Sequence, residues 1–274
     1  MIRIPITDLD LPELALYRER AESQLMHCNE PEPGCFIAES PKVIGRALDA
    51  GFEPISAVVD EAQTGERETA EVLARLPGVP VYTASAAVLK ELVGYKMVRG
   101  LLCMFQRREN PGPAQMAAGA SRIVLLERVT NPTNVGAIIR SAAALWVDAV
   151  ILSADCADPY YRRAARVSMG NVFALPWAYL PANVSCADYI RSLREQGFTA
   201  AAMALDERAV RLGSEELSRA EKLVIVMGSE GEGLRPETIE ACDATVMIPM
   251  SREVDSLNVA AASAVAMWEL RKRS

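Results

Sequence analysis

Several classes of protein are excluded by what this sequence lacks. Its 274 residues contain one histidine, His27, and six cysteines without a Cys-x-x-Cys pair, so no cluster has the ligand spacing of a metal site. No stretch approaches the roughly 20 uninterrupted apolar residues that a membrane-spanning helix needs. The opening MIRIPITDLDLPEL carries three acidic side chains and is unlike a signal or transit peptide. We therefore expect a cytoplasmic protein with reduced thiols, no metal and no membrane attachment.

Positive charge is also in short supply. Asp and Glu outnumber Lys and Arg by 36 to 29, which gives a net charge of −7 and a calculated pI near 5.0. This balance argues against a protein that coats nucleic acid through bulk charge. Local basic clusters occur at Arg107-Arg108, at Arg162-Arg163 with Arg166, and at residues 271–273. Each cluster is typical of a solvated face unless several converge in space.

The apolar half of the composition is sufficient for a large core or for two ordinary domains. Helical and strand-like patterns alternate up to about residue 105, which predicts an α/β domain at 1–105. Residues 106–120 combine charges, prolines and small side chains, and predict a linker without an element of its own. A second α/β domain is then expected at 121–274.

Hydrophobic patterning gives the expected elements of both domains. After an amphipathic segment near 11–27, the first domain is expected to have strands at 35–39, 54–60, 79–82 and 100–105, and helices at 41–50, 66–76 and 85–93. The second is expected to have strands at 122–127, 148–153, 172–175, 198–205, 223–227 and 245–248, and helices at 135–145, from 158, at 185–196 and at 236–241. The β-helix-β order predicts a parallel sheet with helices on its faces.

The stretch from Ile248 to Leu270 combines a polar loop with an apolar helix. Ser256 stands where an N-cap belongs, and the residues from Leu257 onward are apolar or small on every face. This pattern predicts a helix from Ser256 to Leu270 that is buried all round. Asn258 lies in its first turn, where unpaired N–H groups require partners. The helix is either an ordinary capped core helix or one whose polar start faces a ligand.

A glycine-rich turn, Gly228 to Gly233, follows the strand expected at 223–227. Ligands of open α/β folds bind at this carboxyl edge, and glycines let the backbone approach them closely. The turn is neither a Walker A motif nor the Gly-x-Gly-x-x-Gly fingerprint, which disfavours a nucleotide-binding enzyme. Glu230 and Glu232 disfavour an anionic ligand. An ordinary strand-to-helix loop is the alternative.

The loop after the strand at 122–127 offers Asn131 and Asn134 before a helix that carries Arg140 in an apolar setting, AIIRSAAAL. Helical spacing places Asn134 and Arg140 within about two turns of each other. An arginine among Ile and Ala is costly to desolvate without a partner. Arg140 is therefore either part of a site or an arginine that reaches a carboxylate with its long stem.

Together these loops resemble the SpoU/TrmH family of RNA ribose methyltransferases in the SPOUT superfamily. The matching segments are NPTNVGAIIRSA at 131–142, VMGSEGEGL at 226–234 and IPMSREVDSLNVAAA at 248–262, with Asp158-Pro159 and Ser168-Met169-Gly170 between them. The resemblance covers residues 121–271. Less specifically, ESPKVIGRALDAG at 39–51 resembles the family's substrate-binding domain of ribosomal-protein, L30e-like type.

The resemblance implies an α/β fold with a deep trefoil knot, S-adenosylmethionine held in the knot, and a homodimer that acts on rRNA or tRNA. By position, the residues implied to contact the cofactor are Gly228, Ile248 and Leu257. The residues implied to form the catalytic surroundings are Asn134, Arg140, Glu230, Ser256 and Asn258. A non-catalytic RNA-binding or assembly protein that retains the fold is the alternative.

Residue roles follow from the chemistry that this resemblance implies. A guanidinium is essentially always protonated, so we expect Arg140 to position the 2′-hydroxyl and a phosphate instead of acting as a base. Glu230 is expected either to hold the loop in its conformation or to hold the side chain of Arg140 in place. The family pattern has small residues where this chain has Arg252-Glu253, which would reshape the cofactor loop or point to solvent. Because the chain is acidic, its RNA surface is expected to use local arginines such as those at 162, 163 and 166.

Overall fold

The chain folds into two compact units of α/β structure. The computed structural model describes residues 2–18, 22–26, 28, 33–97, 99–205, 209–213, 215–229, 231–251 and 256–272. The first unit comprises Met1–Glu109 together with Tyr160–Ala174. The second comprises Asn110–Pro159 and Leu175–Ser274. A segment from the middle of the chain is thus an integral part of the first unit.

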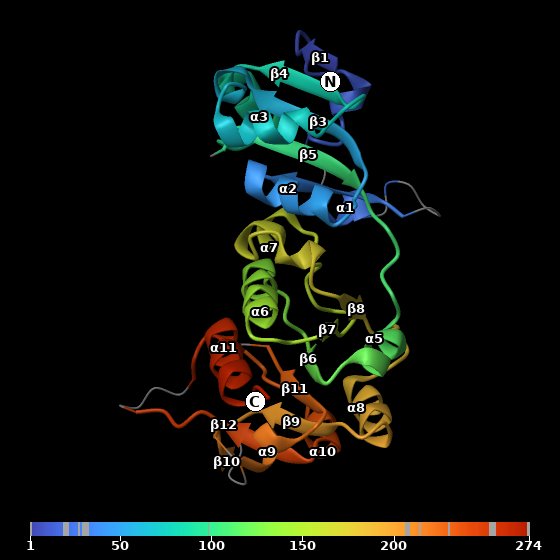
Figure 1. Cartoon of the computed structure of the whole chain (residues 1–274), viewed down its shortest axis with the longest axis vertical. Helices are drawn as coiled ribbons and strands as arrows, with labels where there is room; N and C mark the ends of the chain where they lie inside the picture. The colour runs from blue at the N-terminus through green and yellow to red at the C-terminus, as the bar shows by residue number, and fades with distance from the viewer. Residues whose placement is uncertain are drawn as a thin grey trace. The chain divides into compact units, whose positions relative to one another are not determined.

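The first unit is built on a mixed sheet in the order β1-β4-β3-β5-β2 (Figure 1). Its strands are β1 (Ile2–Pro5), β2 (Cys35–Glu39), β3 (Pro54–Asp60), β4 (Pro80–Ala84) and β5 (Leu101–Gln106). Its helices are α1 (Glu22–Met26), α2 (Pro41–Asp49), α3 (Arg67–Ala74), α4 (Ala86–Val93) and α7 (Arg162–Val167), with short 3-10 turns η1 (Pro12–Leu14), η2 (Glu61–Gln63) and η3 (Asn171–Phe173). β5 runs antiparallel to β2 and β3, whereas the β1–β4 and β3–β4 pairs are parallel.

Local sequence explains these elements well. Every residue of β2 is buried although the strand lies at the edge of the sheet, because α1, α2 and α7 pack against it, and α2 begins with Pro41 in its first turn. The chain leaves α2 through Gly51, whose φ of 78° lies in the left-handed region that favours glycine. The predicted strand Pro54–Asp60 is confirmed at both ends. β1 lies outside every predicted element.

An aromatic cluster ties the segment Tyr160–Ala174 into the first unit. The ring of Phe36 on β2 stacks on those of Tyr160 and Phe173, with centroid distances of 4.9 and 5.2 Å. Arg46 of α2 donates from Nη1 to the carbonyl oxygen of Met169 at 2.8 Å. Burial of aromatic rings contributes strongly to the stability of the first unit. The hydrogen bond from Arg46 holds the turn that follows α7.

A buried carboxylate lies beside the same segment. Glu39 ends β2 with 3% of its side chain exposed, and its Oε2 lies 3.6 Å from Arg162 Nε and 3.7 Å from Arg166 Nη1. A buried charge must be paired, so both arginines neutralise Glu39. Arginines 162, 163 and 166 were expected at an RNA surface. Of these three, Arg163 is exposed and does not pair with Glu39.

The second unit has a fully parallel sheet in the order β10-β12-β9-β11-β6-β7-β8, which confirms the predicted parallel α/β fold (Figure 1). Its strands are β6 (Arg122–Leu126), β7 (Ala149–Leu152), β8 (Trp177–Tyr179), β9 (Thr199–Met203), β10 (Val210–Arg211), β11 (Leu223–Met227) and β12 (Ala244–Met247). Its helices are α5 (Pro113–Gly119), α6 (Pro132–Ala144), α8 (Cys186–Glu195), α9 (Glu215–Arg219), α10 (Pro236–Ala241) and α11 (Val259–Glu269).

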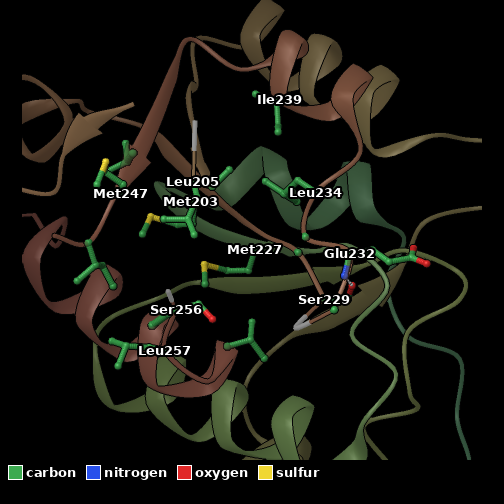
Figure 2. A pocket seen from close by; sticks show the side chains of 18 of the residues that line it. Met203, Leu205, Met227, Ser229, Glu232, Leu234, Ile239, Met247, Ser256 and Leu257 are labelled. Carbon is green, nitrogen blue, oxygen red and sulfur yellow. Dashed lines mark hydrogen bonds between the residues drawn. The ribbon is translucent and has the colours of Figure 1, made fainter. Parts of the chain in front are cut away.

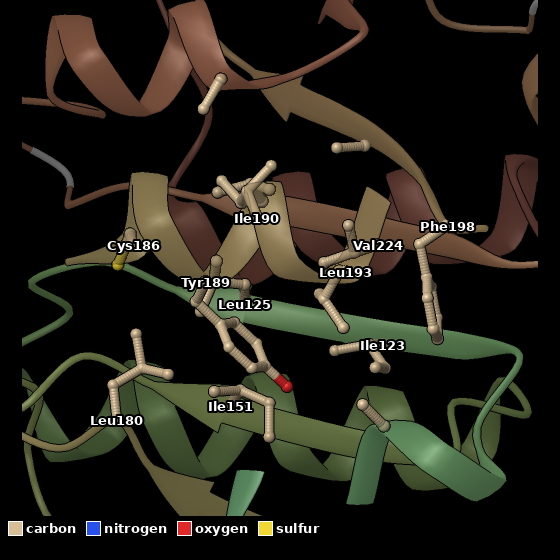
Figure 3. Close-up of a cluster of buried hydrophobic side chains, with 14 of the residues drawn as sticks. Ile123, Leu125, Ile151, Leu180, Cys186, Tyr189, Ile190, Leu193, Phe198 and Val224 are labelled. Carbon is tan, nitrogen blue, oxygen red and sulfur yellow. The ribbon is translucent and has the colours of Figure 1, made fainter. Parts of the chain in front are cut away.

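Alternate residues of the parallel strands fill the core on one face of this sheet (Figure 3). Ile123 and Leu125 of β6 pack there with Ile190 and Leu193 of α8. Tyr189 closes the cluster by donating from its hydroxyl to the Pro113 carbonyl oxygen at 3.1 Å. α6 and α11 pack against each other on the opposite face (Figure 1).

Two predictions in the connecting regions are wrong. The expected linker contains α5, because the run AQMAA is a good helix former and Pro113 pre-sets its first turn. The expected strand at 172–175 is instead the 3-10 turn η3, with the strand β8 beginning at Trp177. Short apolar runs do not distinguish a strand from a buried turn by periodicity alone.

The described residues contain neither a candidate membrane span nor a candidate metal cluster. None of the helices in that part of the chain is long and apolar enough to cross a membrane. Among the same residues, no group of three His, Cys, Asp or Glu side chains could hold a metal ion. His27 lies outside the described residues.

Candidate active site

A cavity of about 440 Å³ opens where β9, β11 and β12 end (Figure 2). Met203, Met227 and Met247 line it from the ends of these three strands. Figure 2 shows Met203 and Met227 beside Ser256 and Leu257, with Ser229 and Glu232 toward the other end of the view. The size and the largely apolar lining are those of a small-molecule site.

The glycine-rich turn forms one wall of this cavity because two stretches of backbone meet there. A Cβ on Gly228 would lie 2.3 Å from the carbonyl carbon of Gly233 and 2.5 Å from the nitrogen of Leu234. No side chain fits in that space. Gly233 has a φ of 67°, and its N–H donates to the Ser229 carbonyl oxygen at 3.1 Å. A hydrogen bond between its own main-chain groups therefore closes the turn where it lines the cavity.

The start of α11 forms a second wall. Asn258 is the N-cap, since its Oδ1 accepts from the Ala260 N–H at 3.0 Å, so the prediction that Ser256 caps this helix is wrong. An asparagine side chain accepts hydrogen bonds from the free N–H groups of the first turn as a serine would. Ser256 is thereby free to line the cavity with Leu257 and Ile248. The prediction of a helix buried all round is also wrong, because Trp268 of α11 is 51% exposed.

Asn134 and Asn258 meet across the site. Asn134 lies in the first turn of α6 and is buried, and its Oδ1 accepts a hydrogen bond from Asn258 Nδ2 at 3.2 Å. Asn131 caps α6 by accepting from the Thr133 N–H at 2.9 Å. The structure thus brings together the beginnings of two helices that lie 124 residues apart in the sequence.

A second cavity, of about 370 Å³, adjoins the first. It is lined by Asn131, Asn134 and Asp155, and it shares four lining residues with the first cavity, which are Ser229, Gly231, Glu232 and Val259. The glycine-rich turn is therefore a wall between two spaces. Such an arrangement can hold two ligands whose reacting atoms meet at the edge of the turn.

Arg128 and Glu127 are site residues that the sequence analysis missed. Arg128 contacts Glu232 through Nη1 and donates from Nη2 to the Gly233 carbonyl oxygen at 3.4 Å. Glu127 is 1% exposed and accepts from the Arg235 N–H at 2.8 Å. Their position directly after β6, at the carboxyl edge of a parallel sheet, was the signal that could have identified them.

Arg140 is placed differently from the other predicted site residues. It is exposed on α6 and lines neither cavity. Among the described residues it has no hydrogen bond or ion pair, so the alternative in which it reaches a carboxylate is wrong for that part of the chain. Its six-residue separation from Asn134 corresponds to about 9 Å along the helix axis and to a different face. Arg140 is thus available to a partner from outside.

Three other predicted positions lie outside the described residues. Glu230, expected in the catalytic surroundings, is one of them. Arg252 and Glu253, expected to alter the cofactor loop, are the others.

The thiol of Cys156, which lies beside the loop after β6, is not a nucleophile. Cys156 Sγ accepts from the Val129 N–H at 3.3 Å, and burial raises the pKa of this thiol. Burial also raises the pKa of Cys186, which packs in the core below. Both thiols stay protonated near neutral pH, so chemistry through a thiolate is disfavoured at this site.

Known proteins share this fold and these motifs. Residues 121–268 match the sequence model of the SpoU rRNA Methylase family. An uncharacterized tRNA/rRNA methyltransferase of Mycobacterium bovis is 39% identical over 244 residues, which are 87% of this chain and 81% of that protein. RlmB of Xanthomonas axonopodis pv. citri, a 23S rRNA (guanosine-2′-O-)-methyltransferase, is 31% identical over 205 residues, 73% of this chain and 80% of that protein.

A solved structure agrees over the whole length. The crystal structure of an AdoMet-bound rRNA methyltransferase from Sinorhizobium meliloti matches with a TM-score of 0.80 and 28% identity, covering 98% of this chain and 97% of that one. The chain belongs to the SpoU rRNA methylase family.

Proposed function

We propose that this chain is an S-adenosylmethionine-dependent RNA methyltransferase that methylates a ribose 2′-hydroxyl of rRNA or tRNA. The observation that carries the proposal is the pair of adjoining cavities that share the glycine-rich turn. One cavity suits a cofactor and the other suits the nucleotide that accepts the methyl group. The activities named for the family relatives support the same reaction.

The first cavity fits S-adenosylmethionine. Methionine and leucine side chains supply an apolar slot for an adenine ring, and the close approach of two backbone segments at Gly228 shapes the wall beside it. Glu232 also lines the cavity, with its carboxylate paired to Arg128. Gly228, Ile248 and Leu257 are the residues that we propose hold the cofactor. When bound, this cofactor supplies a methyl group that is already activated by the positive charge on sulfur.

The chain's own residues then supply orientation. The hydrogen bond between Asn134 and Asn258 fixes the beginnings of α6 and α11 at the boundary of the two cavities. Ser256 lies at the cofactor side and Asn134 at the acceptor side. Fixing two reactants in line lowers the entropic part of the barrier, which is the largest contribution available when the donor is already activated. We assign Glu230 to the same surroundings.

Arg140 completes the acceptor side from outside the cavities. Its guanidinium stays protonated, so it holds the 2′-hydroxyl or the neighbouring phosphate by charge-assisted hydrogen bonds and does not remove the proton. Its exposure and lack of a partner among the described residues leave it available to RNA. In this role it would stabilise negative charge that develops on the attacking oxygen.

The same helices support a homodimer. Val265 and Trp268 lie three positions apart on α11 and are 42% and 51% exposed, and Leu257, just before this helix, is 39% exposed. Trp146, just beyond α6, is 69% exposed. Large apolar side chains that are exposed on neighbouring helices favour a protein partner, and we propose a second copy of the chain.

Further features of the proposal rest on the family resemblance. We propose that the chain from β12 to α11 is part of a trefoil knot and that the first unit is an RNA-binding domain of L30e-like type. We propose a cytoplasmic location, where rRNA and tRNA are found.

Titration calorimetry with S-adenosylmethionine is the first test. The proposal predicts saturable binding by the wild-type chain and its loss in Gly228→Ala, in which a Cβ would collide with backbone. Absence of binding by the wild-type chain would contradict the proposal. Binding without transfer to any RNA would favour a non-catalytic RNA-binding protein instead.

A further inference from the structure

Arg128 has a backbone conformation that an arginine rarely adopts. Its φ is 57°, in the left-handed region where glycine is favoured and a side chain is strained. The N–H of Arg128 donates to Ser153 Oγ at 2.9 Å, which holds the residue in this conformation at the end of β6. Strained backbone at a residue other than glycine is common at functional sites.

The Arg128 side chain reaches from the loop after β6 to the glycine-rich turn. The guanidinium contacts the carboxylate of Glu232, and it donates to the Gly233 carbonyl oxygen at 3.4 Å. The side chain of Arg128 is 21% exposed, whereas that of Glu232 is 75% exposed. Arg128 Nε is buried and has no hydrogen-bond partner among the described residues. The arginine therefore approaches the turn from within and holds it from the acceptor side.

The preceding residue, Glu127, holds the segment that follows the same turn. Glu127 accepts from the Arg235 N–H at 2.8 Å and from Thr238 Oγ1 at 2.9 Å. These two groups lie at the start of α10, just after the turn ends. Two consecutive residues at the end of β6 thus hold the carboxyl-terminal end of the turn and the start of α10, one through its basic side chain and one through its acidic side chain.

Movement of the turn would change both cavities at once. Ser229, Gly231 and Glu232 line the cofactor cavity and the acceptor cavity. We propose that Arg128 is a positioning residue for methyl transfer, which holds Glu232 and Gly233 so that the turn keeps donor and acceptor in line. This inference rests on the proposed function, because it assigns the two cavities to cofactor and nucleotide.

Replacement of Arg128 by glycine tests the effect of its side chain on methyl transfer separately from any effect on the stability of the fold. Glycine adopts a φ of 57° without strain, so Arg128→Gly is expected to unfold at a temperature no lower than the wild type. Without the side chain the turn is released. We expect kcat for methyl transfer to fall about tenfold or more and the KM for S-adenosylmethionine to rise a few-fold, because a displacement of about 1 Å is enough for such losses.

The partner residue gives a second, independent variant. Glu232→Gln removes the charge that Arg128 holds and is expected to lower kcat in the same direction. The double variant Arg128→Gly with Glu232→Gln is expected to lose no more activity than Arg128→Gly alone, since the two residues act through one contact. Arg67→Met serves as the control, because Arg67 pairs with Glu71 on the exposed surface of α3.

The outcomes distinguish this inference from the function on which it rests. A wild-type protein that neither binds S-adenosylmethionine nor methylates RNA would overturn both. An active wild type with kcat and KM unchanged within about twofold in Arg128→Gly would overturn the positioning role alone. Additive losses in the double variant would also contradict it, because the two side chains would then act separately.

Discussion

Two of the hydrogen bonds that Asn258 makes with other described residues belong to different levels of the structure. Its Oδ1 caps α11 by accepting from the Ala260 N–H at 3.0 Å, and its Nδ2 donates to Asn134 Oδ1 at 3.2 Å. The first contact stabilises a helix, and the second joins the two helices at the boundary of the cavities. Substitutions can separate these contacts because aspartate is as good an N-cap as asparagine.

Asn258→Asp should keep stability and lose activity. The carboxylate still caps α11, but it has no N–H to donate to Asn134, so we expect methyl transfer to fall by about ten- to a hundredfold. Asn258→Ala should lose the cap as well and destabilise the fold by about 1 kcal/mol. Urea unfolding and methyl-transfer rates of both variants test this. Equal stability of the two variants would contradict the capping role.

The glycine-rich turn shows how one element depends on a single missing side chain. Gly228→Ala places a Cβ against the backbone of Gly233 and Leu234, which cannot move aside as a flexible side chain would. We expect affinity for S-adenosylmethionine to fall at least about tenfold. Gly119→Ala is the matched control, because nothing lies within 4 Å of a Cβ there. Wild-type affinity in Gly228→Ala would show that the turn does not contact the cofactor.

α7 is held in the first unit by charge as well as by aromatic packing. Removing Arg162 and Arg166 together leaves the carboxylate of Glu39 buried without a partner, which should cost about 3 kcal/mol of stability. Adding Glu39→Gln to that double variant should restore most of the loss. Arg163→Met, an exposed site on the same helix, is the control. Urea denaturation measures all of these, and a larger loss for the triple variant would contradict the pairing.

At the scale of elements, the sequence predicted whatever depends on local pattern. β11 and α10 occur at the predicted residues because a β-branched run and a proline-initiated helix are local signals. The start of α11 was misplaced because Ser256 and Asn258 are both good caps, and only the contact with Asn134 distinguishes them. β10 and α9 were missed because their segments are short and polar.

At the scale of the whole molecule, the sequence could not reveal contacts between distant segments. The contribution of Tyr160–Ala174 to the first unit depends on stacking with Phe36, which has no local signal. The Arg128–Glu232 contact joins residues 104 positions apart. By contrast, the predicted cofactor residues Gly228, Ile248 and Leu257 all line one cavity, and they come from two of the sequence motifs on which the family resemblance rests.

The buried thiols make the whole fold sensitive to alkali. Burial raises the pKa of Cys103, Cys156 and Cys186, and burial with the nearby charge of Asp243 raises that of Cys242 to about 12. Above about pH 8.5 these groups ionise in the unfolded chain while they stay protonated in the folded chain. The free energy of unfolding should therefore fall as the pH rises, by up to about 1.4 kcal/mol per pH unit for each thiol.

Urea unfolding between pH 7 and pH 10 tests this sensitivity. Cys103→Ala should have a shallower pH dependence than the wild type, although the cavity lowers its stability at pH 7. A free energy of unfolding that is constant or rises up to pH 10 would contradict the assignment.

The most direct test of the whole account is methyl transfer from labelled S-adenosylmethionine to unmodified rRNA and tRNA, with the product mapped to the nucleotide. We predict that the wild-type chain methylates a ribose 2′-oxygen at a defined position. Arg140→Ala should reduce that transfer by about a hundredfold or more while it leaves cofactor affinity within about twofold, because Arg140 lines neither cavity. Transfer to a base, or transfer that Arg140→Ala leaves unaltered, would contradict the account.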